Sequence, residues 1–173
     1  MSKKVLTSKE ITEWLLENCV DSQGDLVLER LDFRDFDGDI YMFNWLVKGN
    51  LYQYQHYVKG DLKQGYHEVG GNLEQSYQKV GGNLDQHSNK VGGNLDQDCH
   101  EVKGVLKQGY HEVGGNLRQR SNKVGGNLDQ DYHEVGGDLC QDNHKVDGNL
   151  TEGHHRVSGD YWQKHNHIKG ERK

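Results

Sequence analysis

A small apolar residue recurs every eleven residues along most of the chain, and the residues between follow the same period. With that residue as position 1, the unit reads V-x-G-[N/D]-L-x-Q-x-x-x-[E/K/R]. The glycine at position 3 is present in all thirteen copies, from Gly38 to Gly170. Position 1 is occupied by Phe36, Val47, Val58, Val69, Val80, Val91, Val102, Val113, Val124, Val135, Val146, Val157 and Ile168. A fixed short period of this kind predicts a repeat protein whose units stack on one another.

The unit favours β-structure over helices. A glycine in every unit disfavours long helices, and Asn or Asp after it is typical of turns. Between turns, leucine and glutamine at odd positions alternate with charged or polar even positions, as in half-buried strands. Stacking would place the valines, leucines and glutamines in columns, where glutamines can hydrogen-bond along the stack. One turn could take one unit or two, and two are favoured because eleven residues would enclose a very thin core.

The N-terminal residues depart from this period and predict a helix over residues 7–20. Thr7 or Ser8 can serve as N-cap, and Ile11, Trp14 and Leu15 form an apolar stripe. Such a helix would cover the open first coil of the stack. We therefore expect an all-β fold, a β-solenoid (β-helix) of 11-residue repeats with an N-terminal capping α-helix. Residues 1–35 would form that helix and an irregular first coil, and residues 36–173 the β-solenoid.

The composition of the chain argues against several classes of protein. Low mean hydropathy (-1.02) would allow disorder, but the exact apolar period opposes it. The net charge of -6 is spread evenly, which argues against direct nucleic-acid binding. Cys19, Cys99 and Cys140 have no C-x-x-C spacing, so neither a disulfide framework nor a zinc site is expected. The start lacks an apolar signal region and no run has transmembrane length, so we expect a cytoplasmic protein that does not contact membranes.

The segment G-[N/D]-L-x-Q resembles a pentapeptide-repeat motif, as in Gly82-Asn83-Leu84-Asp85-Gln86. Six residues follow each copy, so the spacing is five plus six instead of five plus five. The chain also resembles short-repeat β-solenoid proteins of tailed bacteriophages, over residues 7–173. The resemblance to pentapeptide-repeat proteins implies a four-sided β-helix, a homodimer through the C-terminal coil, and in several cases binding to topoisomerases as a DNA look-alike.

Histidine fills much of position 10, at His56, His67, His100, His111, His133, His144 and His155. Stacking would align these residues in a surface column, where neighbouring imidazoles could bind a transition metal. Gln78, Asn89 and Asn122 occupy the same position in other units, which favours a solvated polar edge. The expected site therefore contains no metal and no other cofactor.

Acidic residues gather in two stretches that a partner with a basic groove could recognise. Lysines and arginines between the stretches favour the simpler interpretation of a solvated surface of mixed charge. The candidate partner-binding residues are Asp96, Asp98, Glu101, Asp129, Asp131, Glu134, Asp138 and Asp142.

Aromatic residues mark the two ends of the repeat array. Near the N-terminal end they fall in columns that are polar in later units, and the capping helix is expected to cover them. Those residues are Tyr41, Phe43, Trp45, Tyr52, Tyr54 and Tyr57. Near the other end, Tyr161, Trp162 and Ile168 replace consensus residues, and they would form either a C-terminal cap or an oligomer interface.

No arrangement of catalytic residue types stands apart from the repeat, so we expect no enzyme. The leading hypothesis is a non-enzymatic protein-binding solenoid, a phage-type inhibitor of a host defence or DNA-handling complex and in part a DNA mimic. Its acidic residues would contact a basic groove of that complex in the cytoplasm of a bacterial host cell. The alternative is a structural or assembly protein that forms end-to-end oligomers or decorates a particle.

Overall fold

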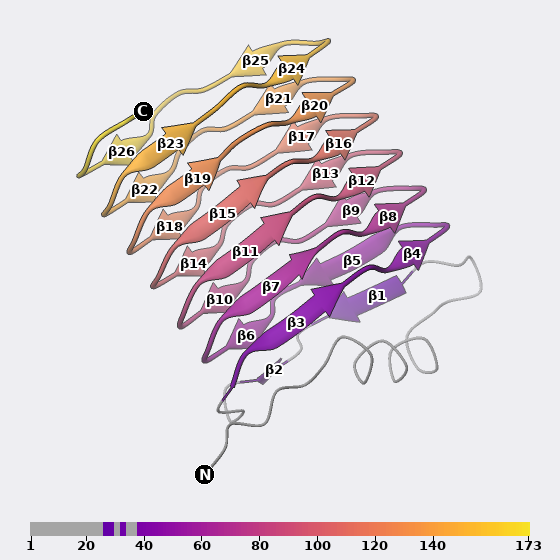
Figure 1. The fold of residues 1–173 in the computed structure, drawn as a ribbon, viewed down its shortest axis with the longest axis horizontal. Coiled ribbons are helices and arrows are strands. Elements are labelled where there is room, and N and C mark those ends of the chain that lie inside the picture. The colour runs from indigo at the N-terminus through magenta and orange to yellow at the C-terminus, as the bar shows by residue number, and fades with distance from the viewer. Residues whose placement is uncertain (1–25, 30–31, 34–37) are drawn as a thin grey trace.

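A computed structural model describes residues 26–29, 32–33 and 38–173, which form a parallel β-solenoid without helices (Figure 1). The predicted all-β solenoid is therefore confirmed over the repeats. The capping helix expected at 7–20 lies outside the described residues.

Each coil of the solenoid contains two sequence units. Strands pair in parallel with partners 22 residues away, as Leu84 does with Leu62 and with Leu106. The prediction of two units per turn is thus confirmed. Each regular unit supplies one strand of two to four residues that starts at position 5 and one strand of two residues that ends at position 1.

Four sheets result, which we number I to IV in the order in which the chain visits them within a coil. Sheet I contains β3 (Ile40–Phe43), β7 (Leu62–Gly65), β11 (Leu84–His87), β15 (Leu106–Gly109), β19 (Leu128–Gln130) and β23 (Leu150–Glu152). Sheet II contains β4 (Leu46–Val47), β8 (Glu68–Val69), β12 (Lys90–Val91), β16 (Glu112–Val113), β20 (Glu134–Val135) and β24 (Arg156–Val157).

Sheet III contains β1 (Leu26–Glu29), β5 (Leu51–Tyr54), β9 (Leu73–Glu74), β13 (Leu95–Asp96), β17 (Leu117–Arg118), β21 (Leu139–Cys140) and β25 (Tyr161–Trp162). Sheet IV contains β2 (Asp32–Phe33), β6 (Tyr57–Val58), β10 (Lys79–Val80), β14 (Glu101–Val102), β18 (Lys123–Val124), β22 (Lys145–Val146) and β26 (His167–Ile168).

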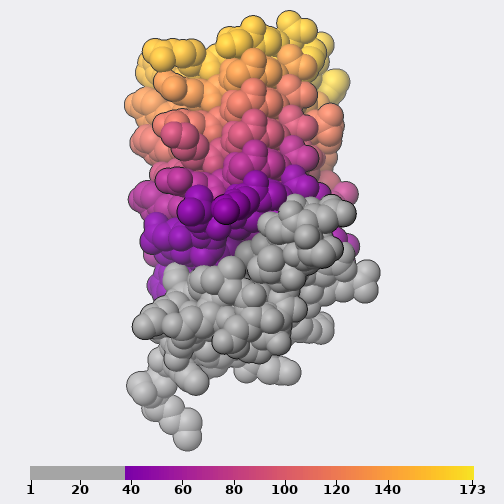
Figure 2. Space-filling model, turned by 90° about the vertical axis from the view of Figure 1, so that its right-hand side faces the viewer, coloured from indigo at the N-terminus to yellow at the C-terminus, as the bar shows by residue number. Residues whose placement is uncertain are grey.

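The core runs the length of the stack as columns of leucine and valine. From Leu51 to Leu150, every position 5 leucine has at most 1% of its surface exposed, and the valines from Val58 to Val146 expose at most 4%. Because each coil buries its apolar residues only against the coils on either side, the molecule extends as a series of layers (Figure 2).

The invariant glycine at position 3 is explained by an Asn ladder at the adjacent corner. The backbone N–H of Asn72 donates to Oδ1 of Asn50 in the preceding coil, at 2.7 Å. A Cβ atom on Gly71 would lie at 2.3 Å from that same oxygen. Glycine is therefore needed wherever the side-chain amide of the coil below occupies this space.

The second corner, at position 9, uses the left-handed backbone conformation without glycine in every complete unit except the one that contains His154. Eleven non-glycine residues have a φ between 53° and 62°, among them Tyr110 and Ser121. Bulky side chains rarely adopt this conformation, so these corners store strain that the stacked neighbours overcome.

The first described coil is longer than the others. Leu26 pairs with Leu51, 25 residues later, and Phe33 pairs with Val58 at the same interval. The irregular first coil expected within residues 1–35 therefore pairs with the next coil through backbone hydrogen bonds and belongs to the β-solenoid.

Candidate binding surfaces

Glutamine at position 7 forms two buried hydrogen-bonded columns, as the sequence predicts. On the sheet III side, Nε2 of Gln97 donates to Oε1 of Gln75 at 3.0 Å, and Gln119 donates to Gln97 at 2.9 Å. On the sheet I side, Gln108 donates in the same way to Gln86 at 3.2 Å. Each primary amide thus accepts from one coil and donates to another, so the polar column lies in the interior without unpaired groups at these residues.

The predicted surface column of histidines is wrong, because position 10 points into the core. Its residues expose at most 1% of their surface from His56 to His144. Two units per turn split the position into two columns. After sheet III the column reads His56, Gln78, His100, Asn122, His144, Asn166, and after sheet I it reads Trp45, His67, Asn89, His111, His133, His155.

These buried residues satisfy the backbone of the preceding coil. The N–H of Gln78 donates to Nδ1 of His100 at 3.3 Å, and the N–H of His100 donates to Oδ1 of Asn122 at 2.9 Å. Histidine and asparagine can replace one another at this position because each presents an acceptor at the δ1 position. Trp45 ends the other column, with its ring 5.0 Å from that of His67.

Burial keeps these imidazoles neutral. It lowers the pKa of His67, His100 and His111 to about 3. It also lowers the pKa of His56 and His144 to about 4. A charged imidazole would lose its hydration there, and among these five residues only His144 has a nearby carboxylate, that of Asp142, which partly offsets the loss.

The histidines do not form a metal site. The rings of His111, His133 and His155 stack face to face, with centroids 5.2 and 4.8 Å apart and planes within 7° of parallel. Stacked parallel rings cannot aim their nitrogen atoms at one common point. Over the described part of the chain, no group of three His, Cys, Asp or Glu residues could hold a metal ion.

The first acidic stretch divides between two faces. Asp96 lies on the outer face of sheet III beside Asp98 and close to Glu74 of the preceding coil. Burial and the neighbouring carboxylates raise the pKa of Glu74 and of Asp96. Asp98 is partly neutralised by Arg120, whose Nη2 lies 3.0 Å from its Oδ2. Glu74, Asp96 and Asp98 form what we call the acidic patch of sheet III.

Glu101, predicted with them, lies instead on sheet IV. It pairs there with Lys79 at 3.4 Å and Lys123 at 3.3 Å.

The second acidic stretch winds around one coil instead of forming a stripe. Asp129 and Asp131 face outward on sheet I, where burial and Asp131 raise the pKa of Asp129. Glu134 lies on sheet II and pairs with Arg156 at 3.0 Å. Asp138 belongs to the corner ladder, because its Oδ1 accepts the N–H of Asp160 at 2.9 Å.

Asp142, the last member of that stretch, lies beyond β21 on the sheet III side. Its backbone carbonyl accepts the N–H of Ser121 at 3.0 Å. The sequence could not show this division, because it depends on where the four corners fall.

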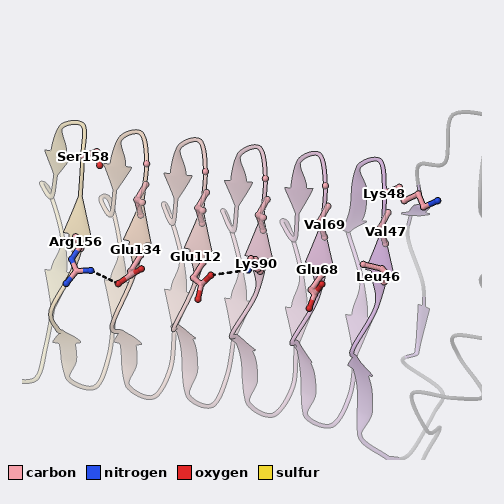
Figure 3. A pocket seen from close by; sticks show the side chains of 17 residues that line it. Leu46, Val47, Lys48, Glu68, Val69, Lys90, Glu112, Glu134, Arg156 and Ser158 are labelled. Atoms are coloured by element: carbon pink, nitrogen blue, oxygen red, sulfur yellow. Dashed lines mark hydrogen bonds and ion pairs between the residues drawn. The ribbon is translucent and has the colours of Figure 1, made fainter.

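A groove runs along the stack beside sheet II and encloses about 820 Å³ (Figure 3). Its floor is formed by valines and by the glycines that follow them. One rim is a row of position 11 side chains, one from each coil: Leu46, Glu68, Lys90, Glu112, Glu134 and Arg156. With Lys48, this groove contains three basic and three acidic residues and is therefore balanced in charge.

A second groove, of about 750 Å³, runs beside sheet IV and is built by the same positions of the other unit. It differs in charge, because five lysines and only two carboxylates line it. The lysines are Lys59, Lys79, Lys103, Lys123 and Lys145, and the carboxylates are Glu101 and Asp147. In a chain of net charge -6 this concentration of positive charge stands out. Sequence reasoning missed it because the two kinds of unit were not separated.

Aromatic side chains are exposed at one corner and on the last coil. Tyr110 and Tyr132 stack at 5.0 Å and are about half exposed. Tyr161 and Trp162 lie on β25, the last strand of sheet III, with 45% and 41% of their surface exposed, and Ile168 is partly buried against the core. This is the coil predicted to form a cap or an oligomer interface.

Cys99 and Cys140 are free thiols, and Cys19 lies outside the described residues. Burial raises the pKa of Cys140 to about 11, so this thiol is a poor nucleophile. Within residues 26–29, 32–33 and 38–173 there is no long apolar helix of the kind that spans a membrane.

Comparison of the chain with protein-family models, with curated proteins and with solved structures gave no match.

Proposed function

We propose that this chain is a non-enzymatic solenoid that binds another protein through an outer face. The observation that supports this best is the acidic patch of sheet III. Glu74 and Asp96 keep carboxyl groups close together in a half-buried setting that raises their pKa, although the strand pairing does not require acids there. Arg118 occupies the equivalent position of the next coil. Such unfavourable charge placement is typical of a binding surface.

The partner proposed is a host protein or complex with a basic groove, such as a DNA-handling or defence complex. In this proposal the chain is a phage-type inhibitor that imitates part of the charge of DNA. The resemblance to phage and pentapeptide-repeat solenoids supports this narrower form, together with the acidic patch. The patch extends over two neighbouring coils, and its clustered carboxylates would complement the positive charge of a groove that normally holds a polyanion.

Paired isosteric variants test the proposal. Tagged wild-type protein is incubated with bacterial lysate, and retained proteins are identified by mass spectrometry. Glu74→Gln combined with Asp96→Asn should abolish capture of the partner without lowering the thermal midpoint, because neutral groups relieve the repulsion. Asp129→Asn combined with Asp131→Asn removes two charges from sheet I and serves as the matched control. Equal capture by wild type and both variants would rule out recognition through acidic residues.

The alternative proposal is an assembly protein, favoured by the exposed aromatic residues of β25. Tyr161 and Trp162 would bury apolar surface against a second copy. Sedimentation velocity over a range of concentrations should then show oligomers that Trp162→Ser dissociates. A monomer at all concentrations would contradict this alternative.

A further inference from the structure

The first four lysines of the sheet IV groove alternate between its two rims, whereas Lys145 lies on the same rim as Lys123. One rim is formed by the residues that precede the valines, and the other by the residues that follow them. In four successive coils the groove presents Lys59 on the second rim, Lys79 on the first, Lys103 on the second and Lys123 on the first. Over these four coils each coil therefore presents one lysine, on the side opposite to the one before.

The fold does not require these lysines. On the sheet II side the same positions after the valines carry Gly70, Gly92, Gly114 and Gly136, and the coils stack equally well. On the sheet IV side, glycine occupies this rim only opposite Lys79 and Lys123. A Cβ atom on Gly81 would lie at 2.3 Å from the carbonyl oxygen of Lys59, and one on Gly125 at 2.4 Å from that of Lys103. These two glycines are therefore required by the close approach of the backbone of the preceding coil, and they place no side chain across from Lys79 and Lys123.

The dimensions of the groove limit what can lie in it. Stacked strands repeat at about 4.8 Å, and the two rims, two residues apart, are separated by roughly 6.6 Å along the strand. An α-helix, about 10 Å across with its side chains, is too wide. A single extended chain fits if it carries one negative charge per coil, directed alternately to the two sides.

We propose that this groove binds a linear acidic polysaccharide of the β-1,4-linked hexuronate class. In such a chain each pyranose ring is turned over relative to the one before, so successive carboxylates project to opposite sides. One ring is also about as long as one coil is thick. The ring faces would lie over the backbone at Val80 and Val102, whose side chains point into the core, while the lysines on either rim would pair with the carboxylates.

Other polyanions match the groove less well. An extended acidic peptide advances about 3.3 Å per residue, so its alternating carboxylates lose register by roughly 1.5 Å in every coil. The phosphates of a DNA duplex follow at about 3.4 Å per strand along the axis, and a duplex is wider than the α-helix that this groove already excludes. Single-stranded nucleic acids need aromatic platforms for their bases, and the lining offers Tyr57 alone.

Glu101 would compete with the carboxylates of the polysaccharide for the lysines of the groove. It occupies the first rim opposite Lys103 and accepts from Lys79 and Lys123. Both ion pairs are exposed, so they are weak and a polymer carboxylate can replace Glu101. Removing this charge should therefore strengthen binding, which a purely structural role of Glu101 would not predict.

Fluorescence anisotropy with a labelled β-1,4-mannuronate hexamer at low salt tests the proposal. Neutral β-1,4-mannose, glutamate and thymidylate oligomers of equal length serve as competing probes. The mannuronate should bind to the wild-type protein and be released at high salt, while the neutral oligomer should not bind. Lys79→Gln combined with Lys103→Gln should weaken the affinity about tenfold, and Glu101→Gln should increase it about threefold.

The matched control removes two positive charges from the sheet II groove, by Lys90→Gln combined with Arg156→Gln. It should leave the affinity unchanged, because the overall charge changes equally but the site does not. An equal loss in the control, or no mannuronate binding by the wild type, would overturn the proposal. Tighter binding of the glutamate or thymidylate oligomer would assign the groove to an acidic protein segment or a nucleic acid and overturn the polysaccharide assignment. Because sheet III is unchanged in these variants, the result is independent of the proposed protein partner.

Discussion

The backbone N–H of Asn122 donates to Nδ1 of His144, one coil further along the stack, at 3.3 Å. An imidazole that accepts at Nδ1 carries its single proton at Nε2 and must be neutral. The N–H of Asn89 makes the same contact with Nδ1 of His111 at 3.3 Å. Protonation of any such ring would turn an acceptor into a donor that faces another donor. The interior of this solenoid is therefore built for neutral histidine.

The free energy of unfolding should fall as the pH falls below about 6.5. The folded pKa of His67, His100 and His111 is about 3, whereas the unfolded value is about 6.5. Between these values the unfolded chain binds more protons, so each histidine contributes a loss of about 1.4 kcal/mol per pH unit. Above pH 7 the dependence should vanish. Thermal midpoints followed by circular dichroism from pH 8 to about pH 4.5 measure this.

Carboxyl groups act in the opposite direction and need a separate control. The raised pKa values of Glu74 and Asp96 let the folded chain bind more protons than the unfolded chain in mild acid, which opposes the loss. His100→Asn removes one buried imidazole and should reduce the difference in midpoint between pH 7.5 and pH 5. His154→Asn changes an exposed histidine and should leave that difference as in wild type. A fall of the same size in all three proteins would contradict the prediction.

The acceptor at position 10 should matter more than the size of the side chain. His100→Asn keeps an Oδ1 acceptor for the N–H of Gln78, whereas His100→Leu leaves this buried N–H unpaired. At pH 7.5 the leucine variant should be less stable than the asparagine variant by about 2 kcal/mol, although leucine fills the space better. Urea denaturation measures the difference. Equal stability would show that packing, and not the hydrogen bond, selects the residue.

Replacing one glutamine of the polar column should lower the free energy of unfolding, because its amide bonds to the coils on both sides. Gln97 donates to Gln75 and accepts from Gln119. Gln97→Met fills the same volume but removes one hydrogen bond from each neighbour. Oε1 of Gln75 still accepts from Asn89 and Nε2 of Gln119 still donates to the backbone carbonyl of Gln108, so the expected loss is about 1–3 kcal/mol. Gln97→Glu should lose more, because a buried acid faces the Oε1 of Gln75. A glutamate variant as stable as the methionine variant at pH 7.5 would refute this order.

Gly93 and Asn72 should be strongly coupled. A Cβ atom on Gly93 would lie at 2.3 Å from Oδ1 of Asn72 in the coil before. Gly93→Ala alone should therefore destabilise the protein by about 2–4 kcal/mol. Combined with Asn72→Gly, which empties that space, the same change should cost clearly less. A double-mutant cycle measures the coupling, and additive losses would mean that the backbone itself excludes the methyl group.

Relieving the strain at one left-handed corner should stabilise the fold. Ser121 is exposed and has a φ of 56°, a conformation that glycine adopts without steric cost. Ser121→Gly should raise the free energy of unfolding by about 0.5–1 kcal/mol, even though glycine has more freedom in the unfolded chain. Ser121→Ala, which retains the strain, should bring no gain. A loss of stability in the glycine variant would contradict this account.

Some of the predicted site residues are close together in the sequence but lie on different faces of the solenoid. Asp129 and Glu134 are five residues apart but lie on sheets I and II, because a corner falls between them. Glu74 was not grouped with Asp96, although one coil brings them side by side. The alternation of lysines in the sheet IV groove was hidden for the same reason.

The period by itself determined the parallel stack, the leucine, valine and glutamine columns, and the glycine corners. These features depend only on which residue recurs at which position, so every coil repeats them. Only the tertiary structure decided that the side chains at position 10 point into the core, so that the histidines there are buried. Their polarity alone favours a place on the surface. They are inside because buried backbone N–H groups need an acceptor there. The tertiary structure also decided which charges share a face, since in a coil of two units the neighbours across the sheet are 22 residues apart. Distance along the chain does not show that relationship until the number of residues per turn is known.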